Sequence, residues 1–262
     1  MNTAQQAIFL LLLAAISGFF VRRAVASSLR EPARFPQANW GLPEAILSIG
    51  LVALFLWMAL ASASSAPSQI NLNAVLSSLS LYGVLAFFIC AFLAARGLNP
   101  IAAFGLRWAE WKAGLLTIPI ALLLAFPFIY LAQWVAYQLS GPSAEPQPIV
   151  TFLLENPGWQ ERLAVAAVAV IAAPIAEELI FRGCVYGVCR KFAGRLAAMF
   201  FTSVVFALIH GHLASLPGLF VLSIALTLVY EKTGSLWAPI GLHALFNGLT
   251  VLSAILWPDL AQ

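Results

Sequence analysis

The chain has 262 residues, of which 62% are hydrophobic and only 9% are charged, and its formal net charge is +3. Soluble globular domains are roughly 45–50% apolar and about 25% charged, so this composition excludes a soluble domain. It predicts an all-α protein that crosses a membrane several times. The small positive charge does not indicate a nucleic-acid partner, because the basic residues gather between the apolar stretches.

Eight apolar stretches approach the length of about 20 residues that a helix needs to span a bilayer. In chain order they cover residues 5–21, 43–64, 74–95, 113–137, 163–187, 196–214, 216–231 and 235–257. The seventh stretch is short, so seven spans remain an alternative to eight. Residues 138–162 form a connection rich in proline and acidic residues, with a short interfacial helix expected around 150–156.

The chain is expected to form one membrane domain with two parts. Residues 1–162 hold the first four helices and the long connection. Residues 163–262 hold the last four helices, and these carry the polar motifs described below.

Basic residues fall in alternate connections, which predicts the orientation of the helices. If these connections are cytoplasmic, twelve of the thirteen Lys and Arg residues are inside and only Arg162 is outside. The twelve are Arg22, Arg23, Arg30, Arg34, Arg96, Arg107, Lys112, Arg182, Arg190, Lys191, Arg195 and Lys232. Both termini would then face outside. The small size and short connections favour a bacterial inner membrane.

The first apolar stretch has a second interpretation, as a cleaved signal peptide within residues 1–26. No basic residue precedes its apolar run, whereas signal peptides begin with a positively charged segment. A first membrane span with its N-terminus outside is therefore the favoured prediction.

The fifth stretch contains two adjacent carboxylates, Glu177 and Glu178. A charged side chain at the centre of a membrane costs about 2.5–3.5 kcal/mol, and such residues usually face the protein interior and serve a function. Glu178 lies four residues before Arg182, so the two share a helix face and can form an ion pair. Glu177 is rotated by about 100° and can face a cavity. Pro174 predicts a kink just before the doublet.

Two other apolar helices carry polar pairs at the same four-residue spacing. Phe206 and His210 lie on the sixth stretch, and His243 and Asn247 lie on the eighth. Polar side chains within a membrane need partners away from lipid. One polar cavity shared by these helices and lined by His210, His243, Asn247 and Glu177 would meet that need.

Such a cavity has the groups needed to hydrolyse a peptide bond. A carboxylate beside a neutral imidazole can hold a water and take its proton, and imidazole and amide N–H groups can stabilise an oxyanion. Glu177, His210 and His243 could instead bind Zn²⁺ with an open water position. No further carboxylate or cysteine ligand is evident, so we favour a mechanism without a cofactor.

Together the polar groups resemble the three motifs of the CPBP intramembrane proteases, also called Abi. The matching residues are Glu177-Glu178-x-x-x-Arg182, Phe206-x-x-x-His210 and His243-x-x-x-Asn247. This family includes Rce1-type CAAX prenyl endopeptidases and bacteriocin-processing or self-immunity proteins. The resemblance covers about residues 160–257, and the first four spans carry no motif.

The resemblance implies a helical bundle whose cavity opens towards the cytoplasmic half and the lipid. It implies that Glu177 activates water with help from His210, while His243 and Asn247 form the oxyanion site. The supporting residues are Glu178, Arg182 and Phe206. The implied substrate is a membrane-associated or lipidated protein or peptide, cleaved near its C-terminus or at a C-terminal sorting segment.

Two other functions stay open. One is a non-catalytic scaffold or immunity protein that keeps the motifs for packing, and the other is a proton-coupled transporter, which the lack of an internal repeat disfavours. The expected boundaries also place His210 about 21 Å from the cytoplasmic end of its helix. They place Glu177 and His243 nearer that end by a helical turn or more.

Overall fold

The computed structural model describes residues 3–30, 35–36, 38–64, 72–106, 111–140, 147–155 and 158–257. Within these ranges every regular element is a helix, which confirms the all-α fold. The elements are α1 (Thr3–Arg30), α2 (Leu42–Ser64), α3 (Leu72–Ala95), α4 (Pro100–Phe104), α5 (Trp111–Ser140), α6 (Pro148–Leu154), α7 (Trp159–Ala167), η2 (Val168–Ala172), α8 (Ala173–Glu178), η3 (Leu179–Tyr186), α9 (Gly187–Ala193), α10 (Arg195–Leu208), η4 (Leu213–Ser215), α11 (Leu216–Thr233) and α12 (Trp237–Leu256). The five segments from α7 to α9 form one continuous helix, called the long helix below.

Seven helices in the described part of the chain are long and apolar enough to cross a membrane. The seventh apolar stretch, residues 216–231, was predicted to be a short span, and this is wrong. Together with the turn before it, α11 forms a span of 21 residues over Leu213–Thr233. The short helix is α10, which has 14 residues and ends at Leu208. Gly211, with a φ of 63°, turns the chain shortly afterwards. A helix of that length reaches only about 20 Å, less than the bilayer core.

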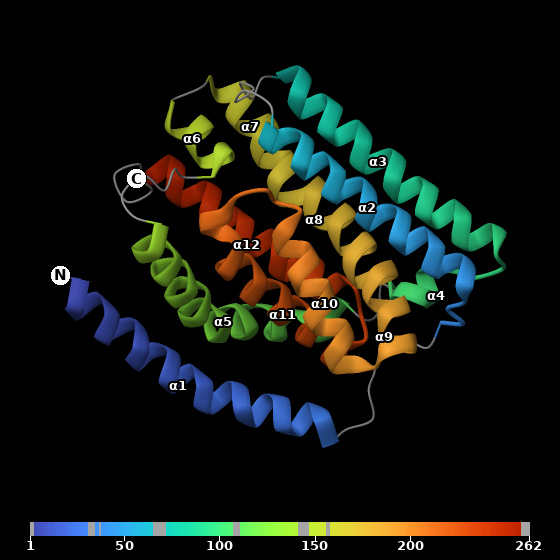
Figure 1. Ribbon diagram of the computed structural model, residues 1–262, viewed down its shortest axis with the longest axis horizontal. Coiled ribbons are helices and arrows are strands. Elements are labelled where there is room, and N and C mark those ends of the chain that lie inside the picture. Colours follow the sequence, from blue (N-terminus) through green and yellow to red (C-terminus); the bar gives the residue numbers. More distant parts are fainter. Residues whose placement is uncertain are drawn as a thin grey trace.

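The helices form a central group with two flanks. The long helix packs with α10, α11 and α12, while α2 and α3 lie along one side of it and α1 lies against α5 on the opposite side (Figure 1). Half of the apolar window of the long helix is buried, compared with 11% in the first span. The core therefore lies in the C-terminal part of the chain, and the first helix is peripheral.

Burial is uneven along the long helix. Every residue from Ala176 to Val188 is buried, whereas the preceding turns alternate between buried and exposed positions. The glutamate doublet lies at the start of this buried stretch. The helix begins at Trp159, a few residues before the boundary expected at 162/163, and α6 supplies the short helix expected around 150–156.

The short helix α4 closes one end of the central group. Asn99 caps its first turn through hydrogen bonds to two backbone amides. Gly105, which follows it, has a φ of 63°, and a Cβ there would lie 2.0 Å from the carbonyl oxygen of Gly234. The carbonyl oxygen of Phe104 accepts a hydrogen bond from the Tyr230 hydroxyl at 3.2 Å. The turn between α11 and α12 is thus buried within the bundle.

The expected depth of Glu177 is corrected by the length of its helix. The helix continues to Ala193 and not to residue 187, so sixteen residues, or about 24 Å, separate Glu177 from its end. His210 follows α10, which is about 20 Å long and starts at the same connection. Glu177 and His210 therefore lie at similar depths, and the mismatch predicted between them disappears. His243 follows the start of α12 by only six residues, but the turn before α12 is buried within the bundle, and this brings His243 to the depth of the other two.

The orientation in the membrane stays a prediction. Arg34 and Arg107, on which it partly rests, lie outside the described residues, as do the side chains of Arg30 and Lys112. Residues 141–146 of the proline-rich connection lie outside them as well.

Candidate active site

Three of the predicted site residues meet around one carboxylate oxygen. Oε2 of Glu177 lies 4.0 Å from Nε2 of His210 and 3.9 Å from Nε2 of His243. The other oxygen, Oε1, accepts a hydrogen bond from the hydroxyl of Tyr82 at 3.3 Å. Oε2 is buried and has no hydrogen-bond partner among the described residues. The long helix, the turn after α10, and α12 therefore each contribute one group to the site, and α3 adds a fourth.

The second glutamate of the doublet is held in a buried ion pair. Nη1 of Arg182 lies 2.7 Å from Oε1 of Glu178, and both side chains are fully buried. The guanidinium also donates to the carbonyl oxygen and hydroxyl of Ser223 at 3.1 and 2.7 Å, and it lies 4.6 Å from the centre of the Phe206 ring. The predicted pair is thus present, and it joins the long helix to α10 and α11.

Hydrogen bonds at Nδ1 determine which nitrogen of each imidazole is protonated. Nδ1 of His243 lies 3.0 Å from Oε1 of Glu178, and Nδ1 of His210 lies 2.7 Å from the carbonyl oxygen of Phe206. A carbonyl oxygen or an ionised carboxylate can only accept, so each Nδ1 carries the hydrogen. In its neutral form each ring therefore presents the Nε2 lone pair towards Glu177. Three hydrogen-bond acceptors converge there, an arrangement that suits a donor such as water.

The donor set has the chemistry of a zinc site but not its geometry. Zinc-bound imidazoles commonly donate their other N–H to a carbonyl or a carboxylate, as His210 and His243 do. Ligand atoms of a tetrahedral site lie roughly 3.4 Å apart, given metal–ligand distances of about 2.0–2.1 Å. The distances around Glu177 are longer, and the described residues contain no group of three His, Cys, Asp or Glu side chains able to hold a metal ion.

Asn247 lies one helical turn beyond His243 on α12, and its amide nitrogen donates to the carbonyl oxygen of Ala169 at 2.8 Å. In the π-helical turn η2, the N–H of Ala173 bonds to the carbonyl five residues earlier. The same register would pair the Ala169 carbonyl with residue 174, which is proline and has no N–H. Asn247 therefore satisfies a backbone acceptor that Pro174 leaves free.

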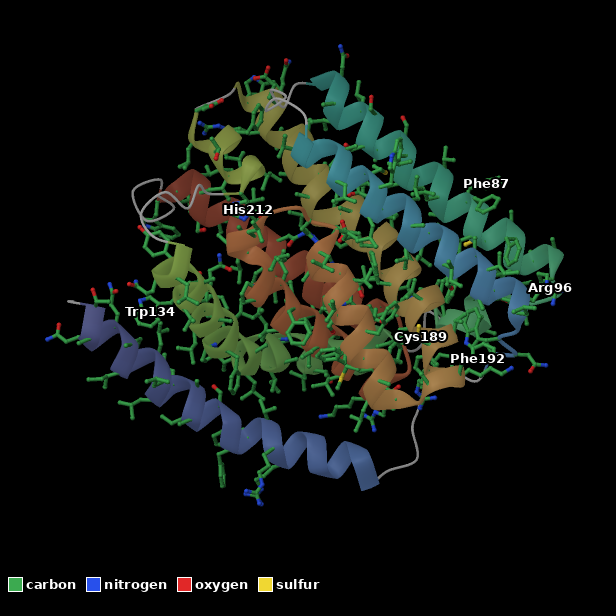
Figure 2. The ribbon with its side chains drawn as sticks, in the orientation of Figure 1. Phe87, Arg96, Trp134, Cys189, Phe192 and His212 are labelled. Atoms are coloured by element: carbon green, nitrogen blue, oxygen red, sulfur yellow. The ribbon has the colours of Figure 1, made fainter. Side chains whose placement is uncertain are left out.

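The exposed edge of the site lies at His210, whose side chain is 27% exposed, compared with 9% for Glu177. On the other side of the doublet, the long helix is buried without interruption as far as Val188. Which of these two ends faces the cytoplasm depends on the orientation in the membrane, so the opening towards the cytoplasmic half that the resemblance implied stays a prediction. Figure 2 shows the side chains that fill the bundle between these helices.

Two site residues were missed by sequence reasoning. Tyr82 lies on α3, which carries no motif, and Ser223 lies within the apolar α11. Each is a hydroxyl within an apolar helix, which is a signal for a buried partner. The partners of both hydroxyls, Glu177 and Arg182, lie on the long helix. Residue spacing within α3 or α11 therefore could not identify them.

Comparisons with known proteins agree with the motifs. Residues 159–249 match the family described as "Type II CAAX prenyl endopeptidase Rce1-like". A segment of 85 residues is 29% identical to "Putative membrane peptidase YdiL" of Bacillus subtilis (strain 168), covering 32% of this chain and 35% of that protein. The chain thus spans about a third of that relative's length. No solved structure matches this chain. Residues 159–249 are therefore similar to the Rce1-like CAAX prenyl endopeptidases, as the three motifs predicted, and they lie in a chain whose described part has seven helices long and apolar enough to cross a membrane.

Proposed function

We propose that the protein is an intramembrane endopeptidase that hydrolyses a peptide bond of a membrane-associated or lipidated protein or peptide near its C-terminus. The observation that supports this most is the surroundings of Glu177. Its buried Oε2 lies 3.9–4.0 Å from two imidazole nitrogens whose ring orientations are fixed by other hydrogen bonds. Distances of this size between acceptors suit a bridging water, the nucleophile that hydrolysis needs.

In the proposed reaction, a water donates one hydrogen to Oε2 of Glu177 and the other to Nε2 of His210. Glu177 removes its proton while the water oxygen forms a bond to the carbonyl carbon of the substrate. The carbonyl oxygen then carries the negative charge. When the C–N bond breaks, the proton held by Glu177 passes to the leaving nitrogen, which restores the carboxylate.

The oxyanion is assigned to His243 and Asn247. The amide nitrogen of Asn247 has two hydrogens, and the bond to Ala169 uses one of them. The other is free to donate to the substrate oxygen. His243 can donate through Nε2 only while its ring holds a second proton. The proton that Glu177 took from the water can pass to His243, 3.9 Å away, while the oxyanion exists, and it returns to Glu177 before the leaving nitrogen takes it.

The position of the site supports the proposed partners of this reaction. The site lies between helices long and apolar enough to span a membrane, which favours a scissile bond that enters from the lipid or from the membrane surface. We propose a lipidated C-terminus or a C-terminal sorting segment as the substrate and a bacterial inner membrane as the location, with both termini outside.

The identity of the substrate is tested by comparing the C-termini of membrane proteins from cells that express the wild type or Glu177→Ala. The proposal expects a set of shortened C-termini that only the active protein produces. Glu155→Ala is a matched control, because Glu155 is an exposed acidic residue at the end of α6. If wild type and Glu177→Ala give the same C-termini, the proposed function is wrong.

Metal dependence is tested on the purified protein with a strong zinc chelator. The glutamate mechanism expects the cleavage rate to be unchanged after chelation. A loss of cleavage that added Zn²⁺ restores would instead assign Glu177, His210 and His243 as metal ligands.

A further inference from the structure

We propose that Tyr82 is a positioning residue, which orients Glu177 for its reaction with water. The inference rests on the proposed function and extends the site beyond the segment that matches the family. Tyr82 lies on α3, 77 residues before the start of that segment. Its hydroxyl donates to Oε1 of Glu177 at 3.3 Å.

The contact divides the two oxygens of the carboxylate between two tasks. Oε1 is bound to Tyr82, while Oε2 faces His210 and His243. The terminal torsion of a glutamate is broad and roughly two-fold, so the side chain does not fix the plane of its own carboxylate. Within the described residues, Tyr82 is the group that donates a hydrogen bond to Glu177. That bond selects the orientation in which Oε2 points at both imidazoles.

The neighbouring glutamate needs no such help. Glu178 is held by Arg182 at 2.7 Å and by His243 at 3.0 Å. Glu177 lies on a different face of the helix and forms no ion pair with Arg182 within the described part of the chain, and Nε2 of His243, at 3.9 Å, is too far away to hold its carboxylate by a direct hydrogen bond. The orienting group for Glu177 must therefore come from another helix, and α3 packs against this part of the long helix.

The sequence of α3 directs Tyr82 inwards. Leu85 and Ile89 follow Tyr82 by three and seven residues, so they lie on the same face of α3. They are 8% and 0% exposed, which shows that this face packs against the rest of the bundle. On the opposite side, Phe87 is 75% exposed and lies on the outer surface of α3 (Figure 2). The tyrosine ring is thus already placed by packing, and its hydroxyl is the part available for Glu177.

The experiment compares Tyr82→Phe with the wild type in a peptide-cleavage assay in lipid nanodiscs. Phenylalanine keeps the ring and its packing and removes the hydroxyl alone. Without the hydrogen bond at 3.3 Å, the carboxylate plane of Glu177 is no longer held in one orientation. We therefore expect kcat to fall about tenfold while KM stays unchanged and the variant stays folded at the assay temperature. The matched control is Tyr137→Phe, which removes the hydroxyl of a tyrosine that is 46% exposed on α5 and should leave both constants unchanged.

Three outcomes would overturn the inference. They are an unchanged kcat, a rise in KM alone, and a fall in kcat that is fully explained by the fraction of the variant that is unfolded at the assay temperature. Glu177→Gln, measured alongside, separates this inference from the proposed function. If Glu177→Gln keeps full activity, the proposed function fails, and the inference fails with it. If Glu177→Gln is inactive while Tyr82→Phe is fully active, only the assignment of Tyr82 is wrong.

Discussion

Replacing Arg182 by methionine should destabilise the protein more than most single substitutions. The side chain is fully buried and makes four contacts, with Glu178, with two atoms of Ser223 and with the ring of Phe206. Methionine has a similar length and can keep the contact with the ring. It removes the charge and strands the Glu178 carboxylate in the core, where His243 is its remaining hydrogen-bond donor among the described residues.

The expected magnitude follows from this burial. Removing one partner of a buried ion pair costs about 3–5 kcal/mol, because an uncompensated charge stays behind. At about 2–4 °C per kcal/mol, the thermal midpoint should fall by about 6–20 °C. Arg96→Met is the matched control, since Arg96 pairs with Glu44 at 3.2 Å but is 49% exposed at the end of α3 (Figure 2). Glu44 is only 2% exposed, but it keeps a hydrogen bond from the backbone amide of Gly41 at 2.7 Å when Arg96 is replaced. Because Arg96 itself is in contact with solvent, the pair should contribute about 0–1 kcal/mol, and its loss should lower the midpoint by no more than about 4 °C.

The assay is thermal unfolding in detergent, followed by intrinsic tryptophan fluorescence. The double variant Arg182→Met/Glu178→Gln removes the stranded charge and should recover most of the lost stability, because a buried pair replaced as a whole is often neutral. If Arg182→Met and Arg96→Met lower the midpoint equally, the buried pair does not stabilise the bundle as described. If the double variant is less stable than Arg182→Met, the stranded carboxylate is not the cause.

Two further substitutions test the local structure of the helices. Asn247→Ala should cost about 1–3 kcal/mol in unfolding free energy, because it leaves the buried carbonyl of Ala169 without its donor. The cost of Asn247→Ala should be smaller when residue 174 is alanine, because the restored N–H of that residue can bond to the carbonyl of Ala169. Additive effects of Pro174→Ala and Asn247→Ala in a double-mutant cycle would show that the two residues do not share this acceptor. Gly187→Ala should cost about 1–3 kcal/mol, because its Cβ would lie 2.9 Å from a buried indole ring. Gly50→Ala, where no atom lies within 4 Å of the added Cβ, should not destabilise, and equal midpoints for the two alanine variants would refute the predicted clash.

The parts of the site that rest on local geometry could be predicted from the sequence. Glu178 and Arg182 are one helical turn apart, so their pairing needed no knowledge of the fold. The meeting of Glu177, His210 and His243 followed from a physical constraint, since polar groups on three apolar helices have to avoid lipid together. The structure places Nε2 of His210 and Nε2 of His243 each within 4.0 Å of Oε2 of Glu177.

The parts that depend on other helices or on backbone register could not be predicted. The hydroxyl of Tyr82 finds its partner 95 residues away, and no local spacing indicates this. The bond from Asn247 to Ala169 depends on a π-helical turn, which shifts the backbone pairing by one residue without a distinct sequence pattern. The end of α10 was placed too late, because hydropathy continues past Leu208 while the backbone turns at Gly211.

The central claim is that Glu177 activates the water that cleaves a peptide bond. It is tested most directly by purifying the wild type, Glu177→Gln and Glu155→Gln and measuring the cleavage of one membrane-anchored peptide, chosen from the C-termini that the wild type shortens in cells. Glutamine keeps the size of the side chain and its bond from Tyr82 but cannot take a proton at neutral pH. The account predicts that Glu177→Gln folds with an unchanged thermal midpoint and cleaves no peptide, while Glu155→Gln cleaves at the wild-type rate. Cleavage by Glu177→Gln at the wild-type rate would contradict it.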